Sequence, residues 1–202
     1  MAYPTVSGPY GLKPVSMISG TPYAGVTRQY RIASAYATNI FYGDVVKLVT
    51  GGTIERDVAD AAMTPIGVFL GCTYTDPNSQ NITFKQYWPA STVASDVMAY
   101  VVDATDVLFK VAVISSAATT TPIVMSTLAI TDIGANVFMV DNVGSTVTGN
   151  SKISVDETSA TTATYPLRVV DVVTDTKTSS TAFAEVLVKG NAGHMLDNTT
   201  GV

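Results

Sequence analysis

Histidine and cysteine, which often act as base and nucleophile in catalysis, are scarce in this 202-residue chain and lie far apart in it. There is one histidine, His194, and one cysteine, Cys72. A nucleophilic thiol or hydroxyl needs a base beside it, and a zinc site needs three or four ligands. We therefore expect Cys72 to be a small buried hydrophobic residue and His194 to be a surface or interface residue. We expect no catalytic residues, no metal and no cofactor.

Two pairs of carboxylates are close enough in sequence to suggest acid–base chemistry, Asp57 with Asp60 and Asp103 with Asp106. Glycosidases use such pairs, together with aromatic platforms that hold the sugar. Both pairs lie at predicted turns, where an aspartate ordinarily bonds its own backbone. The sequence favours turns over a glycosidase site.

Short segments that resemble ion or phosphate loops are also incomplete. Residues 75–81, TDPNSQN, place oxygen ligands at alternate positions, as a calcium loop does. They lack the glycine at the sixth position and the glutamate at the twelfth, where Tyr87 stands. No GxxxxGK[ST] phosphate loop occurs. A plain turn at Asp76-Pro77-Asn78 is the better interpretation.

The charge pattern argues against nucleic acid and membrane as partners. The formal net charge is −5, and the densest basic cluster is only Arg28 and Arg31. No apolar run approaches the ~20 residues of a membrane span, and the N-terminus does not resemble a signal peptide. Charged residues make up only 13% of the chain, about half the usual share, which is typical of a surface covered by partners.

The composition predicts strands rather than helices. There are 28 valines and 29 threonines but only three glutamates. Alternating segments separated by turn residues predict an all-β fold, a β-barrel or β-sandwich. The expected strands are 26–33, 44–49, 53–57, 65–72, 82–88, 97–103, 107–114, 137–140, 151–155, 166–173 and 183–189. Short helical stretches are expected at 58–63, 90–98 and 126–135.

Two hairpins and one strand face are expected in particular. Gly51-Gly52 predicts a hairpin between 44–49 and 53–57, and Ala104–Asp106 predicts a second one between 97–103 and 107–114. In the strand 82–88, Ile82, Phe84 and Trp88 are expected to share one face.

The two ends of the chain differ from its middle. Residues 1–25 hold four prolines, four glycines and three tyrosines, which predicts an extended N-terminal arm. Residues 26–192 form the expected β-rich domain, with 115–122 as the candidate subdivision, and 193–202 form a short C-terminal tail. Tyrosine is enriched at interfaces. The residues expected to bind partners are Tyr3, Pro4, Tyr10, Tyr23, His194, Met195 and Leu196. For the arm, packing on its own domain remains the alternative.

Several segments together resemble head decoration proteins of tailed phages. YGDVVKLVTGGTI (42–54) followed by PIGVFLGC (65–72) is similar to the small β-barrel of those proteins, and DIGANVFMV (132–140), GSTVTGNS (144–151), YPLRVVDVV (165–173) and AEVLVKGNAGH (184–194) resemble head proteins of marine phages. The resemblance implies a non-enzymatic cement protein, seated as trimers or other multimers on the lattice of the major capsid protein. It implies synthesis in the host cytoplasm and residence in the virion, and it carries no catalytic residues. The length and the second half of the chain depart from the simplest members.

Other functions remain open at this stage. A tail-tube, neck or minor capsid protein would share the same β-rich features. A carbohydrate-binding module or adhesin could use Trp88 with Tyr87 and Tyr74 as a sugar platform, although Trp88 ends an alternating strand and is more often a core residue.

Overall fold

The computed structural model describes residues 6, 8–58, 63–114, 128–174 and 183–191. Within them the chain is all-β, as predicted, with one turn of 3₁₀ helix, η1 (Ile130–Asp132). The strands are β1 (Lys13–Met17), β2 (Arg28–Ile32), β3 (Val45–Val49), β4 (Thr53–Arg56), β5 (Gly67–Thr75), β6 (Ile82–Lys85), β7 (Met98–Val102), β8 (Val107–Ile114), β9 (Asn136–Val137), β10 (Met139–Val140), β11 (Ser154–Asp156), β12 (Leu167–Val173) and β13 (Glu185–Gly190). None of the described helical residues forms an apolar segment long enough to cross a bilayer.

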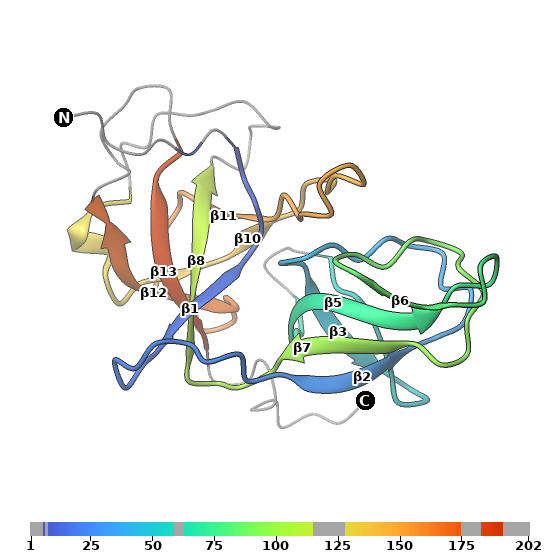
Figure 1. The fold of residues 1–202 in the computed structure, drawn as a ribbon. Coiled ribbons are helices and arrows are strands. Elements are labelled where there is room, and N and C mark those ends of the chain that lie inside the picture. The colour runs from blue at the N-terminus through green and yellow to red at the C-terminus, as the bar shows by residue number, and fades with distance from the viewer. Residues whose placement is uncertain (1–5, 7, 59–62, 115–127, 175–182, 192–202) are drawn as a thin grey trace.

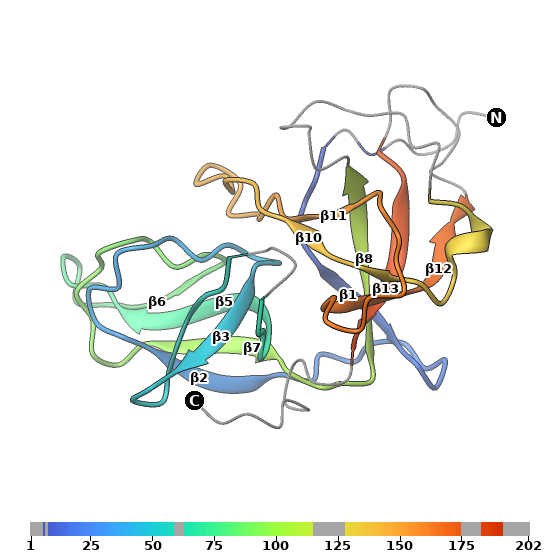
Figure 2. The ribbon, with the colours of Figure 1, turned by 180° about the vertical axis from the view of Figure 1, so that it is seen from behind.

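The strands form two sheets that lie side by side (Figures 1 and 2). The first has the order β3-β4-β2-β7-β5-β6, and β5 also pairs with β3, so that five strands close into a small barrel with β6 attached to it. The second has the order β10-β11-β8-β13-β12-β9, with β1 pairing to β8. We call these the barrel and the second sheet.

Strand β5 closes the barrel because it is long enough to serve different neighbours along its length. Its first residues, Gly67 and Val68, pair with β3, and its last four, from Cys72 on, pair with β6. A bulge between Phe69 and Gly71 lies between these two parts. Bulges bend a strand and increase its twist, which a small barrel requires.

The predicted hairpin across Gly51-Gly52 is confirmed, with Val49 opposite Thr53. The hairpin predicted at Ala104–Asp106 is wrong. Strand β7 pairs with β2 and β5 in the barrel, whereas β8 pairs with β1, β11 and β13 in the second sheet. The short link between them is a crossing from one sheet to the other. The other candidate boundary, 115–122, lies outside the described residues.

The prediction of an extended arm over residues 1–25 is wrong for its second half. Lys13–Met17 form β1, an edge strand that pairs antiparallel with β8. The register shifts between Pro14 and Ser16. Proline is tolerated on an edge strand or at a bulge because its missing N–H breaks no essential ladder bond. Just before β1, Leu12 is fully buried in the core.

The barrel is therefore inserted in the second sheet. The chain begins that sheet with β1, leaves it for β2 to β7, and returns with β8. The two passages lie together, since Ile18 N–H donates to the Asp106 carbonyl (2.7 Å) and Met17 is the register partner of Val107.

The helices predicted at 90–98 and 126–135 are mostly absent. Residues 90–98 form turns, with Ser91 at a positive φ of 61°, and enter β7. Of 126–135, the described part contains only the single turn η1. The central residues of 58–63 lie outside the described part of the chain.

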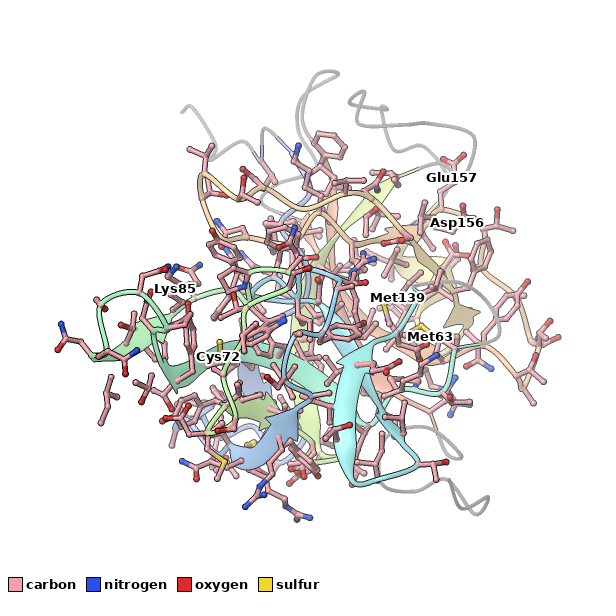
Figure 3. The ribbon with its side chains drawn as sticks, turned by 90° about the vertical axis from the view of Figure 1, so that its right-hand side faces the viewer. Met63, Cys72, Lys85, Met139, Asp156 and Glu157 are labelled. Carbon is pink, nitrogen blue, oxygen red and sulfur yellow. The ribbon has the colours of Figure 1, made fainter. Side chains whose placement is uncertain are left out.

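Two large hydrophobic cores and a smaller cluster around Phe183 hold the described part of the chain. The barrel core surrounds Trp88, whose ring meets Tyr74 edge-on with centroids 5.5 Å apart. The core of the second sheet continues into the barrel wall, because Val45, Val68 and Val102 belong to the same cluster as Phe109. Met63 and Met139 also belong to this cluster (Figure 3). The two sheets are thus joined by a shared apolar layer.

Candidate interaction surface

The cysteine and aspartates that the sequence singled out as candidates for catalysis are buried or hydrogen-bonded within the fold. Cys72 lies inside the barrel (Figure 3), as predicted, and burial raises the pKa of its thiol to about 12. Asp103 is buried, accepting a hydrogen bond from the Tyr30 hydroxyl (2.7 Å) and pairing with Arg28 (3.0 Å). Asp57 accepts from the Thr64 N–H (2.9 Å). Within the described ranges no three His, Cys, Asp or Glu residues gather as a metal site would require.

The segment 75–81 forms the turn that its sequence predicts. The Asp76 carboxylate accepts the N–H groups of Asn78 (2.8 Å) and Ser79 (3.2 Å). These backbone hydrogen bonds lower the pKa of Asp76. The Asp76 carboxylate thus stabilises the turn, as is usual for an aspartate at this position, rather than serving as a calcium ligand.

A buried ionic cluster joins the two sheets. Asp44, which is fully buried beside β3, accepts hydrogen bonds from the Phe41 N–H (2.8 Å) and from Nε of Arg56 (3.0 Å). The other end of the Arg56 guanidinium pairs with Asp141 of the second sheet. Burial raises the pKa of the Asp44 carboxyl, and Arg56 opposes that shift. The cluster braces the two sheets, because the Arg56 guanidinium forms ion pairs with Asp44 on one side and Asp141 on the other.

Backbone contacts reinforce the same joint. Leu12 N–H donates to the Gly43 carbonyl (3.0 Å), and Ser151 N–H donates to the Tyr42 carbonyl (2.9 Å). Gly11 has a φ of +78°, and a Cβ on it would lie 2.7 Å from the Gly43 carbonyl oxygen. Only glycine allows the chain to pass here.

The three aromatic residues considered as an alternative sugar platform do not form an exposed platform. Trp88 is fully buried and its Nε1 donates to the Tyr36 carbonyl (3.3 Å). Tyr74 is also buried against it. Tyr87 is partly exposed but stacks on Phe41 with centroids 5.6 Å apart. The residues on which the carbohydrate-binding alternative depended therefore belong to the interior of the barrel and its joint.

The predicted partner-binding residues that the structure describes, Tyr10 and Tyr23, pack on their own chain. The Tyr10 hydroxyl donates to Glu185, and its ring lies 4.3 Å beneath the Lys13 ammonium. The Tyr23 hydroxyl donates to the Val26 carbonyl (2.8 Å). Any partner role for these two tyrosines remains a prediction. Tyr3, Pro4, His194, Met195 and Leu196 lie outside the described residues.

Strand β6 carries two highly exposed apolar side chains. Ile82 is 83% exposed and Phe84 is 62% exposed. The Phe84 ring rests over Gly71 and near Tyr100, whose ring centroid is 6.2 Å away. Together with Met98, which is partly exposed on the neighbouring strand β7, Ile82, Phe84 and Tyr100 form what we call the β6 face.

The prediction that Ile82, Phe84 and Trp88 share one face of a strand is wrong. Ile82 and Phe84 are exposed, whereas Trp88 is fully buried and lies beyond the end of β6. The register opposes Thr83 and Lys85 to the buried Tyr74 and Cys72, so the polar side chains of β6 lie on the barrel side. The feature of the sequence that could have indicated this exposed face is the uncharged run from Asn78 to Phe84.

A second exposed apolar region belongs to the second sheet. The loop after β10 carries Val143 and Val147, which are 85% and 94% exposed. The Gly149 carbonyl at its end accepts the Tyr42 N–H (3.0 Å), and Asn150 accepts from the Gln86 side chain (2.7 Å). Its base is thus fastened to the barrel while its valines stay in solvent.

A shallow polar depression at one end of the barrel is lined by a single titratable side chain. Its only carboxylate, Asp96, accepts three hydrogen bonds from Thr75, the shortest from the hydroxyl at 2.6 Å, which lower the Asp96 pKa. No protein-family model, curated protein or solved structure matches the chain.

Proposed function

We propose that this chain is a non-enzymatic structural component of a phage virion, a decoration or cement protein that binds and stabilises the lattice of the major capsid protein. The observation that carries the proposal is the exposure of large apolar side chains on both parts of a braced β scaffold. Ile82 and Phe84 on the barrel, and Val143 and Val147 on the second sheet, are all more than half exposed. Such patches on a soluble protein mark surfaces that partners cover.

The scaffold is suited to bridging neighbouring subunits. The Asp44–Arg56–Asp141 cluster and the shared apolar layer hold the two parts together, so that the two apolar regions are carried by one body. Fully burying a valine, isoleucine or phenylalanine side chain contributes about 1.5–3 kcal/mol. Several modest contacts made at once on a lattice combine through effective concentration.

The resemblance of the sequence to phage head proteins supports the same proposal. It implies trimers or other multimers on the capsid surface, assembled without a cofactor. The low charged fraction, 13%, agrees with a surface that is largely covered in the assembled particle.

The proposal is tested by binding of the purified chain to undecorated capsids, measured by co-sedimentation. We expect saturable binding that Val147→Lys weakens at least tenfold, because a charge would be buried at a contact. Thr38→Lys adds the same charge at another exposed site and should bind as the natural chain does.

Mass spectrometry of purified particles supplies an independent measurement. Hundreds of copies per particle are expected for a cement protein, whereas a dozen or fewer would place the chain in the neck or baseplate. Absence from particles, together with no binding to capsids, would refute the virion role.

A further inference from the structure

The outer edge of β6 is unpaired in the part of the chain that the structure describes. Strand β6 pairs with β5 alone. Asp76 N–H donates to the Asn81 carbonyl (3.0 Å) at the start of this ladder. In an antiparallel pair, successive residues alternate between bonding inward and outward. Thr83 and Lys85 therefore bond to β5, and the backbone N–H and C=O groups of Ile82 and Phe84 point to the open edge.

We propose that two copies of the chain pair through this edge, β6 against β6, in antiparallel register about a twofold axis at Thr83. Ile82 of one copy lies opposite Phe84 of the other, and the reverse pair is generated by symmetry. Both residues have outward-facing backbone groups, so this register forms four backbone hydrogen bonds. It also forms two apolar cross-strand pairs, a favoured combination of an aromatic and a β-branched side chain.

A second copy fits this edge better than an unrelated strand because the edge is complementary to itself. Within Ile82–Lys85, the antiparallel register centred on Thr83 is the one that pairs the outward groups of Ile82 with those of Phe84 on both chains. This register places Lys85 opposite Asn81 of the other copy, so that no like charges meet.

Charge also favours pairing at this place over others. The run from Asn78 to Phe84 is uncharged, although the whole chain carries a net charge of −5. Two copies that approach through this edge meet with little repulsion. Natural edge strands are usually protected by charges, prolines or bulges. Within Ile82–Lys85 only the last residue is charged.

The expected interface is small. Pairing two four-residue strands and covering the two Ile82 and two Phe84 side chains buries on the order of 1,000 Å² in total, the lower limit of specific interfaces. We therefore expect a weak pair in solution. A twofold contact cannot close a trimer, so in a trimeric assembly it would join chains of neighbouring trimers.

The test is disulfide trapping of the purified chain and does not depend on capsids. Thr83 faces its own symmetry mate as a non-hydrogen-bonded pair, in which the Cα atoms are about 4.5 Å apart, a distance that a disulfide can span. Under mild oxidation, Thr83→Cys should give a disulfide-linked dimer on a denaturing gel. The matched control is Thr161→Cys, which places an exposed cysteine in the loop between β11 and β12, away from β6, and should remain mostly monomeric.

A second variant separates strand pairing from random collision. In a Thr83→Cys background, Ile82→Pro removes an outward N–H that forms no ladder bond within the chain, and should slow cross-linking at least tenfold. Ile82→Val keeps that N–H and should cross-link at the parent rate. If Thr83→Cys cross-links no faster than Thr161→Cys, or if Ile82→Pro has no effect, the pairing is wrong. A Thr83→Cys chain that stays monomeric yet captures a foreign extended peptide would also overturn it.

Discussion

Leu12 provides a direct test of whether the N-terminal segment is part of the fold. Its side chain is fully buried in the core of the second sheet, next to Gly11 at the joint between the sheets. Replacing a fully buried leucine by alanine costs about 2.7–5 kcal/mol, from lost burial and from the cavity that remains. For a chain of this length each kcal/mol lowers Tm by about 2–4 °C. Leu12→Ala should therefore lower Tm by at least about 5 °C.

The control is Val15→Ala in the same strand. Val15 is 37% exposed, so its truncation should change the stability by less than about 1 kcal/mol. Comparing the two variants separates loss of core packing from any general effect of altering β1.

Urea unfolding followed by two probes makes the measurement more informative. Trp88 is the only tryptophan and lies in the barrel core, so its fluorescence reports the barrel, while far-UV circular dichroism reports both sheets. Because the core around Leu12 includes Val45 and Val68 of the barrel wall, both transitions should shift together. If the free energy of unfolding of Leu12→Ala is within about 0.5 kcal/mol of that of the natural chain by both probes, the segment is an external arm and Leu12 is not part of the core.

Three further predictions concern the joint, the thiol and the barrel. Arg56→Ala leaves the buried Asp44 without its cation and should destabilise the chain by about 3–5 kcal/mol in urea unfolding, whereas the exposed Arg31→Ala should have little effect. Cys72, whose thiol pKa is raised from 9.0 to about 12, should react with a thiol reagent at pH 8 about a thousandfold more slowly in the folded chain than in denaturant; equal rates would contradict its burial. Gly67→Ala places a Cβ 2.4 Å from the Val102 carbonyl oxygen and should lower Tm by several degrees, and an unchanged Tm would refute that packing.

Local patterns in the sequence predicted most strands, because alternation and turn residues act over a few positions. The hairpin at Gly51-Gly52 follows from such local information. The separation of β7 from β8 does not, since three residues that can turn a hairpin can also link two sheets. Strand β1 was missed because Pro14 normally argues against a strand, and only its place at an edge makes it acceptable.

Which side of β6 is exposed also could not be predicted from the local sequence. Ile82 and Phe84 alternate with polar residues as they would in a buried strand. Which side faces inward depends on where β5 leaves the barrel wall, a property of the whole sheet. The scarcity of catalytic groups, in contrast, could be predicted from composition alone for His and Cys, of which the chain has one each.

The insertion of the barrel between β1 and β8 has a consequence for how the chain can be rebuilt. Because Met17 and Val107 are register partners, a short turn between them would convert β1 and β8 into an ordinary hairpin and remove the barrel in a single excision. The barrel in turn is contiguous in sequence, whereas the second sheet receives its first strand some ninety residues before the next one. During synthesis the barrel can thus mature on the ribosome while β1 waits for its partner. The same two connections, after β1 and before β8, are suitable sites at which barrels of other specificity could be inserted without altering the second sheet.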